Sequence, residues 1–345
     1  VAEYKIATGK AVYDAEREKQ KIAAVEGYAH GEFNKEAVRE IFSQLMTISR
    51  RYQYGLLREN GKVSPIDFKL VKEIKRDGVR VVFQGVEGAY SHAATKLYFG
   101  EAADTYHVEQ FEDTMKELEE GRADYAVLPI ENSTAGFVIS NYDLLSKYQV
   151  CIVGEVYVPI KHMLVGLPQA ELSDIKTVYS HNQALMQCSE YLSGHREWRQ
   201  ISAVNTAAAA KKVMEDGDKT KAAIASREAG RLYGLKELAA AINDKKGNTT
   251  RFIILSHHAV YAKKAGKVTI TFELPHVSGS LYNVLGNFIF NGLNMMMIES
   301  RPIPERPFEY RFFVDFEGNL SEEAVQNALT GIRAEASSMR ILGNY

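Results

Sequence analysis

A hydroxyl and a guanidinium stand at the entrance to one of the apolar runs of this chain. The polar stretch Asn-Thr-Thr-Arg at 248–251 leads directly into Phe-Ile-Ile-Leu at 252–255, a run typical of a buried strand. Amide, hydroxyl and guanidinium groups held at the mouth of a rigid strand are what a site for a small anion requires. A simple turn at the start of a strand explains the same residues, so the choice depends on the rest of the chain.

Three further polar loops follow strand-like runs, at residues 85–91, 129–136 and 180–183. Alternating strands and helices place such loops at the edge of a sheet, where α/β proteins bind their ligands. We therefore expect the polar loops to meet around one site. The loop at 85–91 lacks both the Walker lysine and the dinucleotide fingerprint, which disfavours a phosphate cradle. Ser91 is predicted instead to cap the following helix and to present backbone N–H groups to a carboxylate.

Length and composition exclude several classes of protein. The 345 residues suggest two or three domains, and 46% hydrophobic with 25% charged residues is ordinary for a globular protein. A formal net charge of −2 gives no sign of a nucleic-acid or membrane partner, and no apolar run approaches the roughly 18 residues of a membrane helix. Cys151 and Cys188 match no metal-binding spacing and suggest no disulfide, which favours a reducing compartment and a cytoplasmic protein.

Residues 1–60 are predicted to form a small helical unit. Apolar residues recur at helical spacing from Ala15 to Val25 and from Lys35 to Leu57. Asn34 is a candidate N-cap for the second of these helices. The inner stripe of that helix is expected to contain Val38, Ile41, Leu45 and Ile48.

The remaining chain divides into a linker and two further units. Residues 61–78 predict a linker with a short helix. Across residues 79–258 buried strand-like runs alternate with helical segments, which predicts an α/β fold. Residues 267–345 show the order βαββαβ, which predicts an α+β, ferredoxin-like sandwich. The chain is therefore expected to be a multidomain protein with all-α, α/β and α+β parts.

Four motifs in residues 79–258 resemble those of the prephenate dehydratases. They are Gly-x-x-Gly-x-Tyr-Ser at 85–91, Pro-Ile-Glu-Asn-Ser at 129–133, Ser-His-x-Gln-Ala at 180–184 and Thr-Arg-Phe at 250–252. Several motifs in the family's order argue against chance. Two departures, Asn182 where the family often has proline and Asn205 where it often has serine, change local turn chemistry more than catalytic chemistry. The resemblance implies two α/β lobes with the site in the cleft between them, as in periplasmic binding proteins.

The reaction of this family converts prephenate to phenylpyruvate, CO2 and water, and aromatisation drives it, so no metal or redox cofactor is expected. The resemblance places Thr250 nearest the departing hydroxyl, as a hydrogen-bond donor, and leaves the source of the proton open. Arg251 is expected either to hold a carboxylate or to brace the loop, and His181 to be a structural residue at a helix start. The implied catalytic residues are Thr250, Asn132, Ser180 and Gln187, and the implied substrate contacts are Ser91, Ser133, Thr206 and Arg251.

Six polar residues of the N-terminal helices match, in order and spacing, the active site of the helical chorismate mutases that are fused to prephenate dehydratases. A solvated helix face is the alternative interpretation. The family's long first helix, which supplies arginines for the substrate carboxylates, has no counterpart here, so an impaired mutase is expected. The six residues are Lys5, Asp14, Arg17, Glu18, Ser49 and Gln53.

The C-terminal unit resembles the phenylalanine-binding ACT domain of the same enzymes. Glu-Ser-Arg-Pro at 299–302 matches a motif of that domain intact, whereas Gly-Ser-Leu-Tyr at 279–282 is a degenerate form of another. The resemblance implies phenylalanine as an allosteric inhibitor and a homodimer or higher homo-oligomer. The implied effector residues are Gly279, Ser280, Leu281, Asn294, Glu299, Ser300 and Arg301.

Two other functions compete with that of a prephenate dehydratase. Arogenate differs from prephenate only by an amino group on the side chain, and we find no residue in the sequence that excludes it as the substrate. A non-catalytic, two-lobed sensor joined to an ACT module would use the same architecture. The Thr-Arg-Phe motif at 250–252 argues against a sensor.

Overall fold

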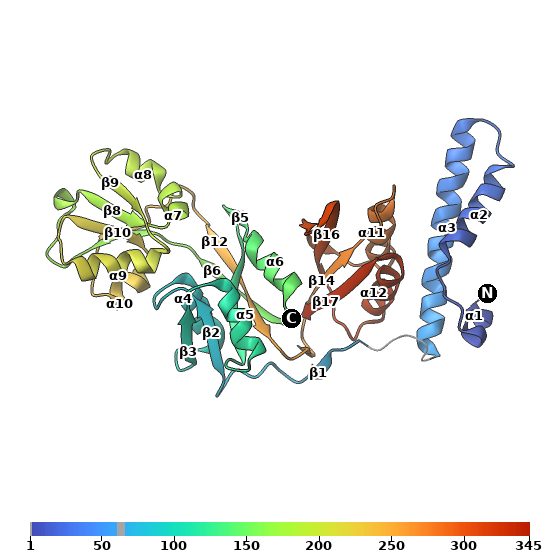
Figure 1. The fold of residues 1–345 in the computed structure, drawn as a ribbon, viewed down its shortest axis with the longest axis horizontal. Coiled ribbons are helices and arrows are strands. Elements are labelled where there is room, and N and C mark those ends of the chain that lie inside the picture. Colours follow the sequence, from blue (N-terminus) through green and yellow to red (C-terminus); the bar gives the residue numbers. More distant parts are fainter. Residues whose placement is uncertain (1, 61–65) are drawn as a thin grey trace. The chain divides into compact units, whose positions relative to one another are not determined.

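The computed structural model describes residues 2–60 and 66–345 (Figure 1). These residues fall into two compact units. One unit combines Val1–Leu70 with Tyr261–Tyr345, and the other is the intervening Val71–Val260. The short strands β1 (Lys69–Val71) and β13 (Val260–Ala262) lie where the chain passes from one unit to the other. Within the described residues, no helix is long and apolar enough to cross a membrane.

Helices alone form the N-terminal part, as the spacing of its apolar residues predicts. They are α1 (Ala2–Thr8), α2 (Ala15–Glu26) and α3 (Glu32–Glu59). The Asp14 carboxylate caps α2 by accepting the backbone N–H of Arg17 at 3.1 Å. The predicted cap of α3 is wrong, because α3 begins at Glu32 and Asn34 lies inside its first turn. The Asn34 amide instead donates to the His30 carbonyl at 2.7 Å.

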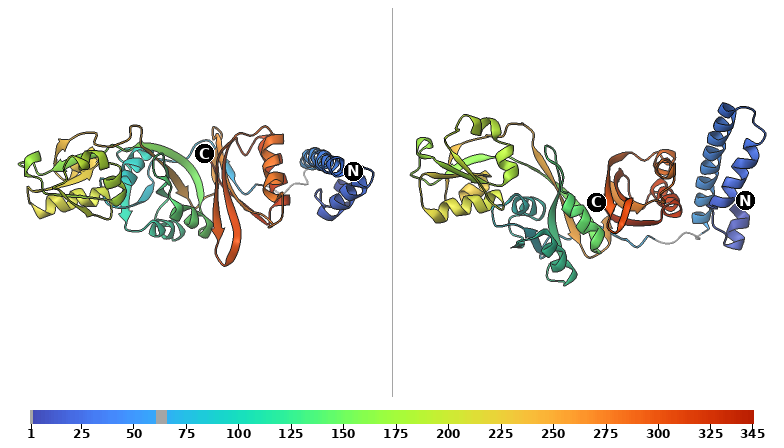
Figure 2. Two further views of the ribbon diagram at one scale, coloured as in Figure 1. Left: turned by 90° about the horizontal axis from the view of Figure 1, so that it is seen from above. Right: turned by 45° about the horizontal axis from the view of Figure 1, so that its top comes forward.

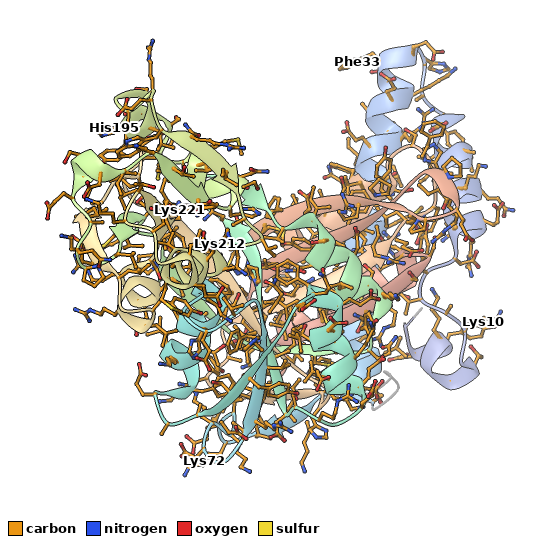
Figure 3. All side chains as sticks on the ribbon, turned by 60° about the vertical axis from the view of Figure 1, so that its left-hand side comes forward. Lys10, Phe33, Lys72, His195, Lys212 and Lys221 are labelled. Carbon is orange, nitrogen blue, oxygen red and sulfur yellow. The ribbon has the colours of Figure 1, made fainter. Side chains whose placement is uncertain are left out.

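The predicted inner stripe of α3 is only partly covered. Val38 is half-buried, but Ile41, Leu45 and Ile48 are 58%, 52% and 50% exposed. The reason is length, because the 7 residues of α1 and the 12 residues of α2 are too few to cover the 28 residues of α3. Phe33, at the start of α3, is also exposed (Figure 3).

The predicted linker forms an extended segment and no helix within residues 66–78. Residues 61–65 lie outside the described residues. Ile66 and Phe68 pack against the apolar core of the C-terminal fold, and their spacing of two residues is that of a strand. The chain then passes through β1 and bends through the charged run at 72–77. The prediction of a short helix is wrong because these apolar anchors hold the segment extended.

The C-terminal fold is a four-stranded antiparallel sheet with two helices on one face (Figures 1 and 2). The strand order is β15-β16-β14-β17, and the element order βαββαβ is the one that the sequence predicts. Phe272, Phe288 and Phe316 are fully buried in its core. The elements are β14 (Lys267–Glu273), α11 (Ser280–Phe290), β15 (Met295–Ile303), β16 (Arg306–Glu317), α12 (Glu323–Glu335) and β17 (Ser338–Asn344).

The unit Val71–Val260 has two lobes, and the first is built on the strand order β6-β12-β4-β2-β3. Strand β2 pairs parallel with β3 and β4, whereas β12 pairs antiparallel with β4 and β6. Its strands are β2 (Arg80–Gln84), β3 (Asp104–Val108), β4 (Tyr125–Asn132), β5 (Gly136–Phe137), β6 (Cys151–Pro159) and β12 (Thr249–Ser256). Its helices are α4 (Tyr90–Phe99), α5 (Phe111–Glu119) and α6 (Ile139–Lys147).

The second lobe is a five-stranded sheet in the order β11-β7-β10-β8-β9. The chain enters it after β6 through residues 160–162 and returns to β12 through residues 240–248. Its strands are β7 (Met163–Gly166), β8 (Thr177–Ser180), β9 (Arg199–Ser202), β10 (Lys221–Ala225) and β11 (Lys236–Ala239). Its helices are η1 (Leu172–Asp174), α7 (Asn182–Met186), α8 (Ser189–Ser193), α9 (Thr206–Asp216) and α10 (Arg227–Leu232).

The two crossovers are hydrogen-bonded to each other. Ile160 N–H donates to the Asn248 carbonyl at 2.8 Å, and His162 N–H donates to Asn243 Oδ1 at 2.7 Å. Ile242 N–H donates back to the His162 carbonyl at 3.1 Å. The connection between the lobes is therefore a paired strap and not two independent linkers.

The second crossover also explains a wrong prediction. The sequence predicts one helix from Ala184 to Leu192, but the structure divides it into α7 and α8. The Asp244 carboxylate accepts the backbone N–H groups of Ser189 and Glu190 at 2.9 and 3.0 Å. A carboxylate from a distant part of the chain thus starts a new helix at this point.

The loop at 85–91 joins the lobes directly. Tyr233 Oη donates to the Glu87 carbonyl at 2.8 Å, and Ser226 Oγ donates to the Gly88 carbonyl at 3.3 Å. Gly88 has a φ of +84°, and a Cβ there would lie 3.1 Å from Ala229 Cα. The glycines of the loop at 85–91 therefore allow the two lobes to approach closely, and they do not form a phosphate cradle. The predicted cap is also wrong, because Ala89 occupies the N-cap position of α4 and Ser91 lies inside the helix.

We expect Gly88→Ala to destabilise the two-lobed unit by about 2–4 kcal/mol, since alanine adds left-handed backbone strain and a clash with α10. The measurement is urea unfolding followed by the fluorescence of Trp198, which is buried in the second lobe. Gly121→Ala is the matched control, because its φ is +67° but nothing lies within 4 Å of the added Cβ. Equal losses in both variants would show that the lobes do not approach closely at Gly88.

Candidate active site

A cavity of about 460 Å³ lies between the two lobes of Val71–Val260. The first lobe contributes the start of α4, the end of β4 and the start of β12, and the second contributes the starts of α7 and α9. The first crossover contributes Ile160 and His162. Residues from all four predicted polar stretches line this cavity, so the prediction that they meet is confirmed.

The pairing of β12 with β4 separates two groups of polar side chains. Thr250 pairs with Asn132, and the next pair along the ladder is Arg251 with Glu131. Successive side chains of a strand point to opposite faces of the sheet. Thr250 and Asn132 line the cavity, whereas Arg251 lies away from it.

The Asn132 amide holds the Thr250 hydroxyl in place. Asn132 Nδ2 donates to Thr250 Oγ1 at 2.9 Å and to Asn248 Oδ1 at 2.7 Å, while its Oδ1 accepts Thr134 Oγ1 at 2.8 Å. Because the threonine oxygen already accepts a hydrogen bond, its own proton is available for donation. Within the described residues the Thr250 hydroxyl donates to no protein acceptor, so this proton can reach a molecule in the cavity.

Gln187 connects the two lobes through the same network. Its Nε2 donates to Thr134 Oγ1 at 3.1 Å, and its Oε1 accepts Asn248 Nδ2 at 3.0 Å. The same Oε1 lies 3.0 Å from His162 Nε2, so this nitrogen carries the proton and donates. Side chains from the first lobe, the second lobe and both crossovers therefore form one continuous chain of hydrogen bonds.

His162 is a buried, neutral imidazole. Its side chain is almost fully enclosed, and burial lowers its pKa below the ordinary value. With the proton on Nε2, Nδ1 is an acceptor, and Tyr90 Oη lies 3.4 Å from it and 3.0 Å from the Lys161 carbonyl. Burial also raises the pKa of Tyr90, so the phenol keeps its proton. The pair thus presents a fixed, uncharged wall to the cavity.

The cavity contains no ionised side chain among the described residues that line it. A small anion there would meet neutral donors, namely hydroxyls, amides and the N-terminal N–H groups of α4 and α9. Asn205 Oδ1 caps α9 by accepting Ala208 N–H at 2.7 Å, which places Thr206 in the first turn. His181 caps α7 through Nδ1, which accepts Gln183 N–H at 3.3 Å, so its predicted position at a helix start is confirmed.

The structure brings five of the eight predicted dehydratase residues to the cavity: Thr250, Asn132, Gln187, Ser91 and Thr206. Three lie elsewhere. Ser180 is fully buried and its Oγ donates to the Ile224 carbonyl at 2.7 Å, whereas Ser133 is exposed and its Oγ accepts Thr249 N–H at 3.0 Å. Arg251 Nε pairs with Glu155 Oε2 at 2.7 Å, and Arg251 Nη1 lies 3.8 Å from Glu131 Oε2. The Glu131 carboxylate therefore faces a cation and not the cavity.

Sequence reasoning missed Tyr90, His162 and Phe137, which also line the cavity. Tyr90 lies inside the motif at 85–91 and could have been found there. His162 follows the end of a strand in a short segment, and no spacing in the sequence reveals its contact with Gln187, 25 residues away. Phe137 stands on the two-residue strand β5, which is too short to predict.

A family model described as "Prephenate dehydratase" matches residues 81–260 of this chain. The chain belongs to the prephenate dehydratase family. A second model, "Chorismate mutase type II", matches residues 1–54. The dehydratase match contains both lobes and the whole cavity, and the mutase match contains α1, α2 and most of α3.

Similar proteins carry the same two names. A bifunctional chorismate mutase/prephenate dehydratase of Enterobacter agglomerans is 33% identical over 353 residues, covering 100% of this chain and 88% of that protein. The arogenate dehydratase/prephenate dehydratase 1 of Arabidopsis thaliana is 40% identical over 283 residues, 77% of this chain and 72% of that one. The structure of an Arthrobacter aurescens prephenate dehydratase in complex with L-Phe matches with a TM-score of 0.72 and 32% identity, over 77% of this chain and 89% of that one.

The mutase-like residues form two groups, one on or beside α1 and α2 and the other on α3. Gln53 Nε2 donates to Ser49 Oγ at 3.1 Å on α3, and Glu18 on α2 pairs with Arg50 of the same helix α3. The remaining three residues, Lys5, Asp14 and Arg17, lie on α1 and at the start of α2. Lys5 Nζ donates to the Val12 carbonyl at 2.6 Å, and burial lowers the pKa of Lys5.

The predicted effector residues lie in two places on the C-terminal fold. Gly279, with a φ of +84°, is the N-cap of α11, and Ser280 and Leu281 begin that helix beside a cavity of about 360 Å³. The other four residues, Asn294, Glu299, Ser300 and Arg301, lie at the start of β15 and along it. The described residues that line this cavity include none of these four.

The neutral His162 of the dehydratase site predicts a dependence of stability on pH. Its folded pKa lies below the ordinary value of 6.5, so the unfolded chain takes up a proton first as the pH falls. This contribution to stability is complete above pH 6.5 and is lost as the pH falls toward the lowered pKa. We expect the thermal midpoint of the parent to fall between about pH 7 and about pH 5, and that of His162→Gln to fall less. An equal fall in the thermal midpoints of the parent and of His162→Gln would contradict this expectation.

Proposed function

We propose that this chain converts prephenate to phenylpyruvate, CO2 and water at the cavity around Thr250. The bond between the ring and its carboxylate breaks, and its electron pair completes the aromatic ring. The C4 hydroxyl leaves as hydroxide, which becomes water on gaining one proton. The observation that supports this most strongly is the Thr250 hydroxyl, which Asn132 orients with its proton free.

The role of Thr250 is to donate a hydrogen bond to the departing hydroxyl. The bond that it accepts from Asn132 polarises its O–H and fixes its direction. A donor placed where negative charge develops stabilises the transition state more than the ground state. Thr250 does not act as an acid, because a threonine hydroxyl keeps its proton at neutral pH.

The neutral lining of the cavity suits a decarboxylation. The ring carboxylate must lose its charge to become CO2, so a cation beside it would stabilise the substrate more than the transition state. Among the described lining residues only His162 and His181 titrate near neutral pH, and burial lowers the pKa of both. We therefore assign the stabilisation of the departing hydroxide to hydrogen bonds and not to a charged imidazole.

Arg251 serves as a brace in this proposal. Its side chain is 8% exposed and is enclosed by Glu155 and Glu131 on the face of β12 opposite to Thr250. A buried guanidinium with carboxylate partners fixes strand geometry, since removing either partner leaves an unpaired charge. Of the two roles left open by the sequence, the ion pairs favour bracing over contact with the substrate.

Replacing Thr250 with the isosteric valine is expected to lower kcat for phenylpyruvate formation by about 10²–10³, because the donor to the leaving hydroxyl is lost. Thr250→Ser is the matched control, because it retains the hydroxyl and should stay within about tenfold of the parent. Ultraviolet absorbance of phenylpyruvate measures both. A Thr250→Val variant as active as the parent would remove Thr250 from the mechanism, and an inactive parent would favour a two-lobed sensor.

Arogenate is the second candidate substrate. The Arabidopsis thaliana relative that is 40% identical is named an arogenate dehydratase/prephenate dehydratase. No carboxylate among the described lining residues is present to bind the amino group of arogenate. Comparing kcat/KM for the two compounds decides between them. A higher kcat/KM with arogenate would identify arogenate, and not prephenate, as the substrate.

The N-terminal helices supply a mutase-like site in this proposal, acting on chorismate. Ser49 and Gln53 share a face of α3, and Glu18 lies across from α3 on α2. Only Lys5 and Arg17 among the six residues are cations, which is few for a dianionic substrate. We therefore expect weak mutase activity, which the disappearance of chorismate measures.

The C-terminal fold acts in this proposal as an ACT domain with a ferredoxin-like topology that binds phenylalanine. The relative from Arthrobacter aurescens is described as a complex with L-Phe. Because the described lining of the cavity at the start of α11 contains no residue of β15, we propose that two copies complete the effector site. A homodimer or higher oligomer follows, and sedimentation in the presence of phenylalanine tests it.

Phenylalanine is expected to lower the dehydratase rate, and Glu299→Gln to raise the concentration needed for half-inhibition by roughly tenfold, because a charged partner for the amino group is lost. The rate without phenylalanine should be unchanged. Glu305→Gln, an exposed carboxylate in the turn after β15, is the matched control. A dehydratase rate that millimolar phenylalanine leaves unaffected would exclude this regulation.

A further inference from the structure

A buried arginine joins the mutase-like helices to the C-terminal fold. Arg50 lies on α3, directly after Ser49, and its side chain is 7% exposed. Its Nη1 pairs with the Glu18 carboxylate of α2. Its Nη2 donates to Glu335 Oε1 at 3.1 Å and to Thr47 Oγ1 at 2.9 Å. Glu335 is the last residue of α12, so one guanidinium links three helices.

The link depends on arginine in particular. The planar guanidinium offers donors in two directions and binds two carboxylates at once, which an ammonium on a flexible stem does less well. Glu335 is as deeply buried as Arg50, and burial raises its pKa. Buried charges persist only with partners, so neither side chain can turn toward solvent without a large cost. The ion pair with Glu335 of α12 therefore fixes the position of Arg50.

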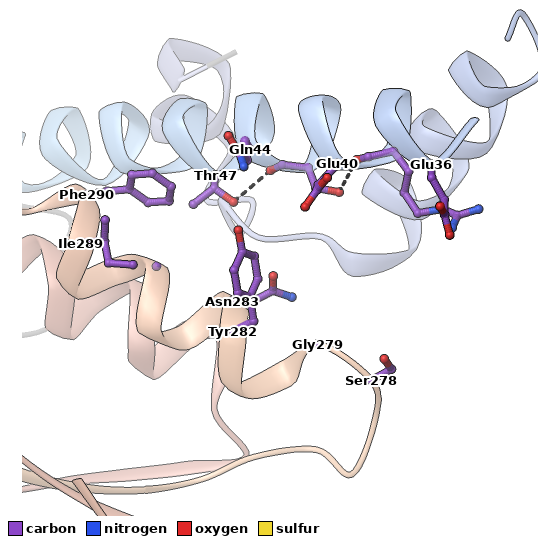
Figure 4. A pocket seen from close by; sticks show the side chains of 13 residues that line it. Glu36, Glu40, Gln44, Thr47, Ser278, Gly279, Tyr282, Asn283, Ile289 and Phe290 are labelled. Atoms are coloured by element: carbon purple, nitrogen blue, oxygen red, sulfur yellow. Dashed lines mark hydrogen bonds between the residues drawn. The ribbon is translucent and has the colours of Figure 1, made fainter. Parts of the chain in front are cut away.

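Other side chains around Arg50 also support the contact between α3 and the C-terminal fold. The Tyr13 ring lies 5.0 Å from its guanidinium carbon, which is within the range of a cation–π interaction. Thr47, which accepts from Arg50, also lines a cavity of about 570 Å³ between α3 and α11 (Figure 4). Figure 4 shows Gln44 and Thr47 of α3 opposite Tyr282 and Asn283 of α11. The C-terminal fold thus faces α3 through both of its helices.

We propose that Glu335 acts through Arg50 as a positioning residue for Glu18, so that the C-terminal fold sets the geometry of the mutase-like site. Glu18 is one of the six mutase-like residues, and Arg50 is its ion-pair partner. With Glu335 in place, the guanidinium is shared between two carboxylates. When α12 moves or loses this carboxylate, Arg50 follows Glu18 alone, and the Glu18 carboxylate changes its position and its availability to a substrate. The inference rests on the proposed mutase and effector roles.

Hydrogen exchange of the whole protein tests the link from Glu335 through Arg50 to Glu18, and it does not require enzyme activity. We expect Glu335→Gln to raise the exchange rates of amides in residues 15–26 by about tenfold, because the constraint on Glu18 passes through the removed charge. Glu322→Gln is the matched control, since Glu322 is an exposed carboxylate at the N-cap of the same helix. Arg50→Lys should resemble Glu335→Gln, and combining the two should add little. Unchanged exchange in Glu335→Gln would overturn the proposal.

Kinetics distinguish a positioning role from a purely structural one. We expect Glu335→Gln to change KM for chorismate by roughly tenfold, with an unchanged dehydratase kcat that also shows correct folding. Phenylalanine should alter the mutase rate of the parent and of Glu322→Gln but not that of Glu335→Gln. A parent without mutase activity means that the proposed mutase function fails. An active parent whose Glu335→Gln variant has the parental KM means that this inference fails, as does unchanged exchange.

Discussion

The hydrogen bonds of one asparagine side chain determine what the dehydratase cavity can do. Asn132 donates to Thr250 and to Asn248, and it accepts from Thr134, so its amide orients the Thr250 hydroxyl and the strap behind it together. An amide suits this place because it donates and accepts at the same time without carrying a charge. An aspartate could donate to neither Thr250 nor Asn248, and it would repel an anionic substrate.

Charge is used in opposite ways in different parts of this molecule. The cavity is lined by neutral groups, whereas the guanidinium of Arg251 lies behind it with Glu155 and Glu131. Arg50 is likewise buried between Glu18 and Glu335. In both places a buried arginine fixes the positions of neighbouring elements. Its planar guanidinium binds two carboxylates, and a buried charge without a partner would be costly. The binding of a small anion is left to amides, hydroxyls and helix N-termini.

Local patterns predicted most elements, and contacts between distant residues explain most failures. The alternation of strands and helices in 79–258 and the βαββαβ order after 267 follow from periodicity, which is local. The break between α7 and α8 depends on Asp244, more than 50 residues away, and the exposed stripe of α3 depends on how much surface its neighbours cover. Thr250 and Asn132 could be predicted as neighbours from their motifs, but His162 could not, because its partner Gln187 is reached only through the fold.

The paired crossovers connect the angle between the two lobes to the position of the Thr250 hydroxyl. Any change in the angle between the lobes must alter the bonds from Gln187 to Thr134 and from Asn248 to Gln187, because these bonds span the lobes and the strap. The same bonds lead through Asn132 to the Thr250 hydroxyl. A hydroxyl displaced by even about 1 Å is a poor donor to a leaving group. In the proposed mechanism, an effector that changes the lobe angle slightly would therefore inhibit the reaction without entering the cavity.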